Sequence, residues 1–456
     1  MCGICGFTGY RQDQKTVIER MMKAIEHRGP DSEGSFCREK ITLGFRRLSI
    51  IDLEDGQQPM ESADGNLHIV FNGEIYDYKE LRAELEDFGI SFCTHSDTEV
   101  LVNTIQLYGE KALNKLRGMF GFAVWNEQEQ SLMLARDFFG IKPVYYAEID
   151  GHFVFASEIK SILAFPGYER KVNQKALEQY LSFQYAPLEE TFFKGIYKLM
   201  PGHMLLYKNG NYEIKTYFKP KLTPGQWNHK TNMAQLRSQL SEILKDSVKH
   251  HMLSDVEVGA FLSGGVDSGY LASSSGADQA FTVGFDEGDR YSEVNKAAKV
   301  AEKAGLKHHV KIISKQEFWD ALPDVMYHMD EPLGDASAVA LYFLSKEAAG
   351  HVKVVLSGEG ADELFGGYNI YREPESLKKI AWIPFGVRRV IGKLAAKLPD
   401  VKGRDFLIRA GMKVEERFIG NAYIYREKEK TQILKNKVTG PSTQEYLRPF
   451  FEELES

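Results

Sequence analysis

The stretch VEVGAFLSGGVDSG, residues 256–269, decides the fold of the second half of this chain. A short apolar run passes directly into a turn of serine and glycine, and a helical pattern follows the turn. At such a junction, backbone N–H groups and the helix N-terminus can together hold an anion. The stretch matches neither the GxxxxGK(S/T) pattern nor the GxGxxG dinucleotide fingerprint. It therefore predicts a phosphate site of a different kind.

Outward from this stretch, strand and helix patterns alternate from Met233 to about residue 360. Apolar runs such as AFTVGF, KHHVKII and VKVVLSG are separated by helical segments such as EVNKAAKVAEKAG. Because strands joined through helices usually run parallel, this alternation predicts an α/β domain with a parallel sheet. After Tyr368 the pattern is helical and fairly basic, which predicts a helical C-terminal part.

The first half of the chain has a different pattern. Up to about Tyr207, runs such as ITLGFRRLSIID, LHIVFNGEI and GMFGFAVWN predict strands, and segments such as VIERMMKAIEH and DTEVLVNTIQLYG predict helices. The economical arrangement is an α+β domain with helices packed on sheets. Its last segment, MPGHMLLYKNGNYEIKTYF, predicts a hairpin that turns at Asn209 and Gly210. We therefore predict an α+β domain at 2–215, a polar linker at 216–232 and an α/β domain at 233–456.

The bulk composition excludes some classes of function. A chain of 456 residues with 43% apolar residues is long enough for two or three packed domains. A formal net charge of −7 gives no broad attraction for nucleic acid or for an anionic membrane. The sequence has no apolar run of about 18 residues and no signal-peptide pattern, so we expect a cytoplasmic protein. The four cysteines are too few to cross-link the chain, and we expect them to be thiols.

Cys2 directly follows the initiator methionine. Removal of Met1 would leave a thiol and a free α-amine on one residue, and an α-amine with a pKa of roughly 7.7 to 8.0 can take the thiol proton. Cys2 is therefore a candidate nucleophile that needs no separate histidine. Two other interpretations remain open from the residue alone: an incidental thiol, or a CxxC redox or metal motif formed with Cys5.

The spacing of histidine and cysteine gives no clear metal motif. A CxxC zinc site would need a second ligand pair at suitable spacing, and the sequence supplies none. The pairs His250/His251 and His308/His309 fit no metal spacing either. We therefore interpret these histidines as surface or core residues.

Seven segments in the first half resemble, in order, the class II glutamine amidotransferases, which are N-terminal nucleophile hydrolases that release ammonia from glutamine. The segments are MCGICG at the N-terminus, HRGPD at 27–31, RRLSIID at 46–52, FNGEIY at 71–76, SDTEV at 96–100, GMFGFAVW at 118–125 and RDFFGIKPVYY at 136–146. The resemblance implies an αββα sandwich for this half. We interpret HRGPD as a supporting turn beside the pocket, and Cys5, Cys37 and Cys93 as core thiols.

Glutamine carries an α-carboxylate and an α-ammonium, and its site must pair both so that the side-chain amide meets the thiolate. Arg47 suits the carboxylate through a bidentate fork, and Asp97 suits the ammonium. The Asn72 side chain and the Gly73 backbone N–H are the expected donors to the oxyanion. The resemblance adds Glu74 at the amino group and a pocket lining formed by the main chain of Arg47, Leu48, Ser49, Ile50 and Ile51.

The loop at Ser263 resembles the SGGxDS loop of the ATP pyrophosphatases, which cleave ATP to AMP and pyrophosphate. The resemblance implies that Asp267 holds Mg²⁺, a hard cation that prefers carboxylate and phosphate oxygens. It also places Leu262 and Val283 beside the adenine, at the carboxyl edge of the sheet, where such folds bind ligands. The β- and γ-phosphates are expected at Ser263, Gly264, Gly265 and Ser268.

A second string, VKVVLSGEGADELFGGY, again ends an apolar run with a glycine turn and carries three acids. Here the resemblance narrows to the asparagine synthetases. It implies that Ser357 and Gly358 contact the nucleotide. It also implies that Glu359 is a catalytic residue for adenylate formation and that Asp362 completes the metal site. The residues expected to border the aspartate and pyrophosphate region are Glu363, Gly366, Gly367 and Tyr368.

The combined resemblance implies glutamine-dependent synthesis of asparagine from L-glutamine, L-aspartate and MgATP through β-aspartyl-AMP, with a homodimer as the family's expected assembly. Asparagine synthetases usually continue with an RVPFLD-like segment and a catalytic lysine, whereas this chain ends at Ser456 with LRPFFEELES. That departure leaves a truncated form, a partial sequence or a variant with impaired synthetase chemistry as interpretations. Three alternative functions are ligation on another carboxylate, glutamine hydrolysis with an inert ligase half, and non-catalytic sensing of glutamine or nucleotide.

Overall fold

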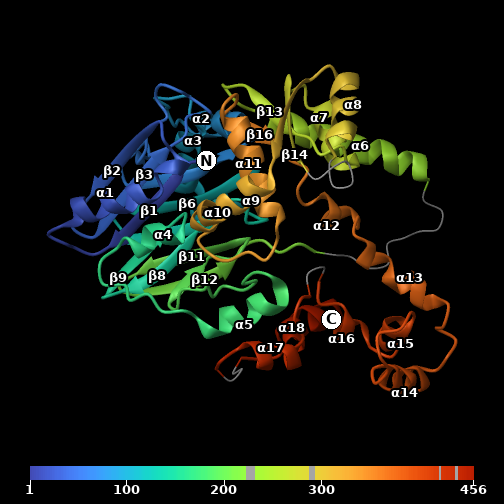
Figure 1. Ribbon diagram of the computed structural model, residues 1–456. Helices are drawn as coiled ribbons and strands as arrows, with labels where there is room; N and C mark the ends of the chain where they lie inside the picture. The colour runs from blue at the N-terminus through green and yellow to red at the C-terminus, as the bar shows by residue number, and fades with distance from the viewer. Residues whose placement is uncertain (222–231, 287–292, 421–422, 437–439, 456) are drawn as a thin grey trace. The chain divides into compact units, whose positions relative to one another are not determined.

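The computed structural model describes residues 1–221, 232–286, 293–420, 423–436 and 440–455 (Figure 1). Contacts between residues divide the chain into two units. The first unit comprises Met1–Val172, Leu188–Asp330 and Ala336–Ser357, and the second comprises Asn173–Pro187, Glu331–Asp335 and Gly358–Ser456. Most of the predicted linker at 216–232 lies outside the described residues.

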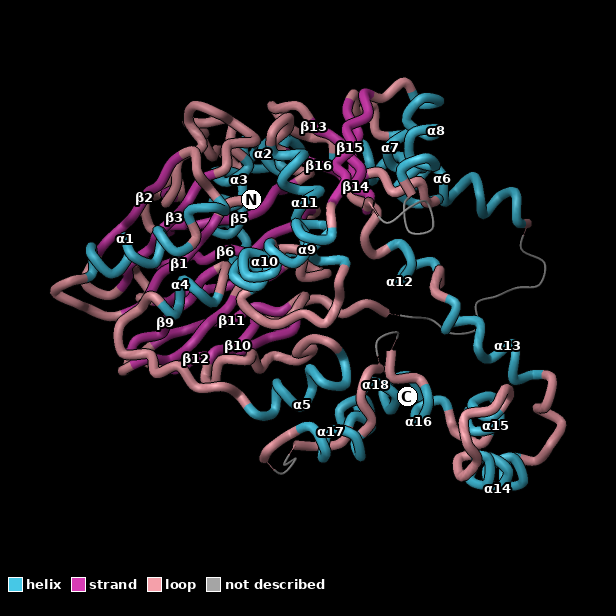
Figure 2. Tube along the Cα trace, viewed as in Figure 1, coloured by secondary structure: helices cyan, strands magenta, loops and turns pink. Residues whose placement is uncertain are grey.

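Two antiparallel sheets form the N-terminal part of the first unit (Figure 2). The first sheet has the order β10-β8-β9-β1-β3-β2, and the second has the order β12-β11-β7-β6-β5-β4. The strands of the first sheet are β1 (Gly3–Thr8), β2 (Ser32–Cys37), β3 (Ile41–Arg47), β8 (Tyr145–Ile149), β9 (His152–Ala156) and β10 (Ile196–Lys198). Those of the second are β4 (Met60–Glu61), β5 (Leu67–Ile75), β6 (Gly118–Asn126), β7 (Ser131–Arg136), β11 (His203–Lys208) and β12 (Asn211–Thr216).

The strands of both sheets are apolar on two faces because each sheet lies between a sheet and a helical layer. In β5, Val70 packs into the core between the sheets, whereas Ile69 and Phe71 pack against helices on the outer face. The first sheet is covered by α1 (Gln14–Ala24) and α4 (Ile159–Leu163), and the second by α2 (Tyr78–Asp87) and α3 (Asp97–Tyr108). This layering confirms the predicted αββα sandwich.

The predicted closing hairpin is confirmed. Strands β11 and β12 pair antiparallel, with Lys208 opposite Asn211. Asn209 and Gly210 between them have φ angles of 53° and 78°, the left-handed conformation that a two-residue turn of this kind requires. Strands β1 and β2 were not predicted, because their glycines and polar residues weaken the strand pattern.

A parallel four-stranded sheet forms the rest of the first unit and confirms the predicted α/β part. Its order is β15-β14-β13-β16, with β13 (Val258–Phe261), β14 (Gln279–Phe285), β15 (Lys307–Ile313) and β16 (Val354–Leu356). The strand order reverses between β13 and β16, so their carboxyl ends flank the position where such folds bind ligands. The described helices here are α6 (Met233–His251), α7 (Val266–Ser274), α8 (Val294–Ala304), α9 (Lys315–Asp320), α10 (Leu322–Met329) and α11 (Ser337–Ala349).

The second unit is helical, as predicted for the C-terminal part, and it also includes α5 (Gln174–Phe183). The backbone of α5 receives hydrogen bonds from later residues, including Ile424 N to Ser182 O at 3.1 Å. Its other helices are α12 (Ala361–Phe365), α13 (Glu373–Lys378), α14 (Phe385–Ala395), α15 (Arg404–Ala410), α16 (Val414–Arg417), α17 (Glu427–Ile433) and α18 (Thr443–Glu455). Among the described helices of the chain, none has both the length and the apolar character needed to cross a bilayer.

Candidate functional site

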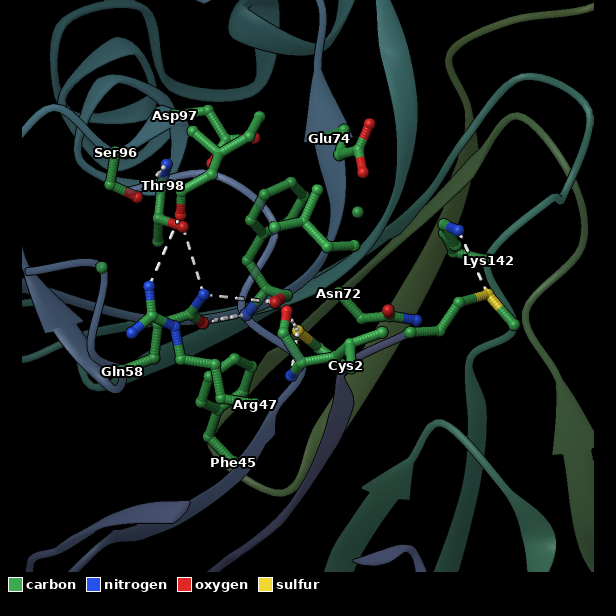
Figure 3. Close-up of a pocket in the computed structure, with 17 residues that line it drawn as sticks. Cys2, Phe45, Arg47, Gln58, Asn72, Glu74, Ser96, Asp97, Thr98 and Lys142 are labelled. Atoms are coloured by element: carbon green, nitrogen blue, oxygen red, sulfur yellow. Dashed lines mark hydrogen bonds between the residues drawn. The ribbon is translucent and has the colours of Figure 1, made fainter. Parts of the chain in front are cut away.

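A pocket in the N-terminal sandwich gathers residues from five separate segments (Figure 3). They come from the residues that lead into β1, the end of β3 and its following loop, and β5, and a further group comes from the first turn of α3 and from the loop after β7 that carries Lys142. All the residues predicted for the nucleophile and the glutamine site line this pocket except Ser49. The backbone N–H of Ser49 instead donates to the Asp31 carboxylate at 2.9 Å. The lining includes Cys2, Arg47, Leu48, Ile50, Ile51, Asn72, Gly73, Glu74 and Asp97.

The Cys2 thiol lies against the end of β3. The backbone N–H of Leu48 donates to its Sγ at 3.4 Å. Arg28, from the HRGPD segment, donates through Nε to the carbonyl oxygen of Cys2 at 2.9 Å. Burial raises the pKa of the Cys2 thiol, while the chain's α-ammonium and Arg28 act in the opposite direction. The thiol is therefore held in place and needs a nearby proton acceptor to ionise at neutral pH.

Asn72 presents a free donor to the pocket. Its Nδ2 is buried and has no hydrogen-bond partner within the described residues. A buried donor without a partner costs roughly 1–3 kcal/mol, so an acceptor in the pocket would find this group already desolvated. The next residue must be glycine, because a Cβ at Gly73 would lie 2.1 Å from the carbonyl oxygen of Met119 on β6. Close strand pairing thus fixes both residues beside Cys2.

Two buried acids and one buried cation also line the pocket. Burial raises the pKa of Glu74 to about 7, and the charge of Asp97 adds to this effect. Burial likewise raises the pKa of Asp97 to about 6, although the N–H of Ile75 donates to its carboxylate at 3.0 Å. Lys142 has its pKa lowered to about 8 by burial, an effect that Glu74 opposes. Two buried acids with raised pKa values beside a single cation favour the entry of a further positive charge.

Lys142 was missed in the sequence, although it lies in the RDFFGIKPVYY segment. Its Nζ lies 3.1 Å from the Sδ of Met1. Gln58 was also missed. It accepts a hydrogen bond from Phe71 N at 2.6 Å and donates to Thr98 Oγ1 at 3.1 Å, which joins β5 to α3. Lysine and glutamine are common on protein surfaces, so the sequence alone does not show that these two residues line a pocket.

Arg47 differs from its predicted geometry. Its Nη1 donates to the carbonyl oxygen of Leu53 at 3.3 Å, and its Nη2 donates to the carbonyl oxygens of Ile51 and Asp52. The guanidinium therefore supports the backbone of the loop after β3. Binding a carboxylate in a bidentate manner would require Arg47 to exchange these partners.

The SGGVDS loop lies at the carboxyl end of β13, as the sequence predicts. Gly264 has a φ of 78°, and a Cβ there would lie 2.8 Å from the backbone N of Ala297. The hydroxyls of Ser263 and Ser268 are 2.9 Å apart, and the N–H of Gly265 donates to Ser263 Oγ at 3.3 Å. Asp267 occupies the first turn of α7. Serine hydroxyls, close backbone and a carboxylate thus meet in one turn.

The remaining predicted nucleotide residues of the first unit lie at the same sheet edge. Leu262 is buried and donates through its N–H to Phe281 O at 2.9 Å. Val283 lies on β14, two residues beyond Phe281 and therefore past the end of β13. Ser357 directly follows β16, the other neighbour of β13. Gly265 and Ser268 belong to the turn and to α7, as described.

The other predicted residues of the synthetase motif belong to the second unit, around α12. They form a tight turn, since the N–H of Gly367 donates to Asp362 O at 2.9 Å and a Cβ at Gly367 would lie 1.8 Å from the Asp362 carboxylate. Tyr368 donates through its hydroxyl to Glu363 at 2.9 Å. The members of this group are Gly358, Glu359, Asp362, Glu363, Gly366, Gly367 and Tyr368.

The prediction of three core thiols is wrong for Cys93, which is exposed. It lies in the segment between α2 and α3. Cys37 is half-buried at the end of β2. Cys5 is buried in β1, and burial raises its pKa to about 12. Only Cys5 is thus a core thiol.

Two protein families match this chain, each over a different part of it. Residues 1–218 match the glutamine amidotransferase domain, and residues 239–445 match the asparagine synthase family. Asparagine synthetase [glutamine-hydrolyzing] 1 of Bacillus subtilis (strain 168) is 44% identical and covers 99% of this chain and 73% of its own. A putative asparagine synthetase [glutamine-hydrolyzing] of Mycobacterium tuberculosis (strain ATCC 25618 / H37Rv) is 38% identical, and the match covers 95% of this chain and 71% of the relative. Glutamine phosphoribosylpyrophosphate amidotransferase from B. subtilis aligns with 68% of this chain and 65% of its own, at a TM-score of 0.38 and 18% identity.

The raised pKa of Glu74 predicts a dependence of stability on pH. The ordinary value is 4.5 and the folded value is about 7, so the folded chain retains a proton that the unfolded chain has released. The stability contributed by that proton is present below about pH 4.5 and is lost as the pH rises to about 7. We expect Glu74→Gln to remove this loss. The thermal unfolding midpoint of the variant should rise relative to wild type between about pH 5 and about pH 7.

Glu80→Gln is the matched control, because Glu80 is an exposed acid on the neighbouring helix α2. Its midpoint should stay parallel to wild type across the same range. A Glu74→Gln curve parallel to wild type would contradict the raised pKa.

Proposed function

Because this chain belongs to the family of glutamine-hydrolysing asparagine synthetases, we propose that it forms L-asparagine from L-aspartate with ammonia released from glutamine and with ATP as the energy source. The observation that supports the glutamine half most directly is the pocket that joins the Cys2 thiol, the free Asn72 donor and two buried acids. Cys2 is the nucleophile in this proposal. Asn72 and Gly73 are the donors to the oxyanion.

The first reaction begins with transfer of the thiol proton of Cys2 to its own α-amine after Met1 is removed. The thiolate adds to the side-chain amide carbon of glutamine. The negative charge that develops on the amide oxygen is accepted by Asn72 Nδ2 and the Gly73 N–H. The amine returns the proton to the leaving nitrogen, ammonia departs, and water releases glutamate from the thioester.

Recognition of glutamine rests on charge. We assign its α-ammonium to Asp97 and Glu74, whose buried carboxylates are only partly balanced by Lys142. We assign its α-carboxylate to Arg47, after exchange of the loop carbonyls that the guanidinium now contacts. We assign the main chain of Leu48, Ser49, Ile50 and Ile51 to the lining of the glutamine pocket.

The nucleotide site of the proposal lies at the carboxyl edge of the parallel sheet. The turn at Ser263, with its hydroxyls and a glycine that has no space for a side chain, suits the β- and γ-phosphates. Mg²⁺ bound by Asp267 and Asp362 would neutralise phosphate charge, and the carboxylates present fit a hard cation. The other assignments are Gly264, Gly265 and Ser268 to phosphate, Leu262 and Val283 to adenine, and Ser357 and Gly358 to the nucleotide.

The second reaction uses aspartate as the acceptor. Its side-chain carboxylate attacks the α-phosphorus of ATP and displaces pyrophosphate, and Glu359 is assigned to this step. Ammonia then adds to the carbonyl of β-aspartyl-AMP and AMP leaves, giving asparagine. A carboxylate is a poor electrophile, and adenylation supplies the leaving group that makes it reactive. Glu363, Gly366, Gly367 and Tyr368 are assigned to the region of aspartate and pyrophosphate.

The proposal assigns glutamine hydrolysis to residues 2–215, a linker to 216–232 and synthesis to 233–456. It also includes a cytoplasmic location, which was expected from the sequence, and a homodimeric assembly, which is the expectation for the family. Light scattering coupled to size-exclusion chromatography tests the assembly, because a dimer of this chain has a mass of twice 51.8 kDa.

We expect Cys2→Ala to abolish glutamine hydrolysis, because the variant has no thiolate to form the thioester. Ammonia-dependent synthesis should not change, since the variant alters only the glutamine pocket. Glutamate release and asparagine formation from ammonium chloride are the two measurements. Cys93→Ala is the control, because Cys93 is exposed and outside the pocket. Glutamate release by Cys2→Ala at the wild-type rate would exclude this nucleophile.

We expect Asn72→Ala to reduce kcat for glutamine hydrolysis by about 10² to 10³-fold, as the loss of one oxyanion donor does. KM should change much less, because the donor acts on charge that develops after binding. The unfolding temperature should not fall greatly, since the Asn72 amide nitrogen has no partner to lose among the described residues. An unchanged kcat, or a loss explained by unfolding, would exclude the oxyanion role.

We expect Asp267→Asn to eliminate ATP-to-pyrophosphate exchange in the presence of aspartate while glutamine hydrolysis persists. The change removes a carboxylate that the proposed Mg²⁺ needs. Asp278→Asn, at an exposed acid just before β14, is the matched control and should retain exchange. Magnesium-dependent exchange at the wild-type rate in Asp267→Asn would refute the metal role.

A further inference from the structure

Three side chains outside both proposed active sites come together beside the parallel sheet. His309 lies on β15, while Glu347 and His351 lie one helical turn apart at the end of α11 and just beyond it. Each offers one ligand atom, and these atoms all lie within 4.8 Å of one another. The sequence analysis interpreted His309 as a surface or core residue and did not predict this grouping. Its partners are about forty residues away in the sequence, so spacing within the histidine pairs could not reveal them.

The fold holds these three side chains on one small surface. Helix α11 packs against β14 and β15, as Figure 2 shows. Beneath the histidines lies Phe281 of β14, which is fully buried and stacks on His309 with ring centroids 5.0 Å apart. The rings of His309 and His351 are themselves 4.0 Å apart. The Nε2 of His351 and the Oε1 of Glu347 are 3.7 Å apart. The cluster thus joins the edge strand of the sheet to the covering helix.

A second layer of hydrogen bonds orients His309. Its Nε2 lies 2.8 Å from Oε1 of Gln279, and Nε2 of Gln279 donates to the carboxylate of Glu257 at 2.7 Å. With Gln279 as the acceptor, His309 carries its proton on Nε2 and leaves Nδ1 as a lone-pair donor. Histidines that bind metals are commonly fixed in this way through their second nitrogen.

We propose that His309, Glu347 and His351 bind a divalent transition metal ion of the zinc class. Two imidazoles and one carboxylate form a set of three ligands that Zn²⁺ accepts, with water as the fourth. Ligand atoms of a tetrahedral Zn²⁺ are about 3.4 Å apart, so rotation of the partly exposed side chains brings them into range. Mg²⁺ prefers oxygen ligands and does not suit this set. The bound ion would cross-link β15 to α11.

The affinity of the site can be measured in the full chain after dialysis against EDTA, by competition with a chromophoric zinc chelator and by thermal unfolding. We expect Zn²⁺ to raise the unfolding midpoint by about 3 °C at a large excess over Kd, and MgCl2 to give no shift that depends on these residues. Glu347→Gln and His351→Ala should abolish the zinc shift. Gln279→Ala should weaken zinc binding about 10 to 100-fold by freeing the His309 ring.

His308→Ala is the matched control, because His308 is the adjacent histidine and its Nε2 faces Thr282 Oγ1 at 2.7 Å. It should retain the zinc shift. Co²⁺ should give the visible absorption of a tetrahedral site without thiolate charge-transfer bands. Equal zinc binding by wild type and His351→Ala, thiolate bands that assign the ion to a cysteine, or no zinc binding by wild type would each overturn the proposal. Glu347→Gln and His351→Ala alter partly exposed side chains, and their metal-free unfolding curves show whether they fold.

Discussion

A buried carboxylate, Glu158, connects the N-terminus to both parts of the first unit. It accepts a hydrogen bond of 2.8 Å from Nη1 of Arg28, whose Nε donates to the carbonyl oxygen of Cys2. Lys160 joins Glu158 on its other side and lies 3.0 Å from Asp330, which ends α10. Burial would raise the pKa of Glu158, but its hydrogen bonds and the two cations hold it well below its usual range. Breaking a buried pair leaves an uncompensated charge at a cost of about 3 to 5 kcal/mol, so the position of Cys2 depends on the whole network.

The strands and helices that could be predicted are those whose hydrophobic pattern is recognisable in the sequence alone, without knowledge of the elements that pack against them. The apolar run at β5 is continuous because Val70 and Phe71 face two different cores. Motif order was enough to predict most of the pocket, since residues such as Asn72 are held by pairing between strands that both carry quoted motifs, FNGEIY in β5 and GMFGFAVW in β6. Lys142 and the role of Gln58 could not be predicted, because burial opposite distant partners gives a lysine or glutamine its function. The prediction for Cys93 was wrong for the same reason, because the exposure of this residue depends on packing that the local sequence pattern does not encode.

The electrostatic balance of the pocket explains how glutamine can be both recognised and oriented. Burial leaves Glu74 and Asp97 with raised pKa values, so ionising both in the unliganded pocket is unfavourable. An α-ammonium ion supplies the missing positive charge and lowers both pKa values by its presence. In the proposed function, binding of the ammonium at these acids directs the side-chain amide toward Cys2 and the unpaired Asn72 donor, which line the same pocket. Recognition of the charged group would thereby position the amide for attack.

The residues at the carboxyl edge of the parallel sheet differ in their proposed role from those near its amino edge. The turn at Ser263 and the residue Ser357 leave the carboxyl ends of β13 and β16, where the reversal of strand order creates a ligand position. His309 instead pairs with Phe281 near the amino end of β14, away from that edge. Because α11 leads into β16 through a few residues, an ion that ties α11 to β15 would also restrain the strand that carries Ser357. A metal bound near the amino end would therefore restrain β16 without competing for the residues at the carboxyl edge that we assign to the nucleotide.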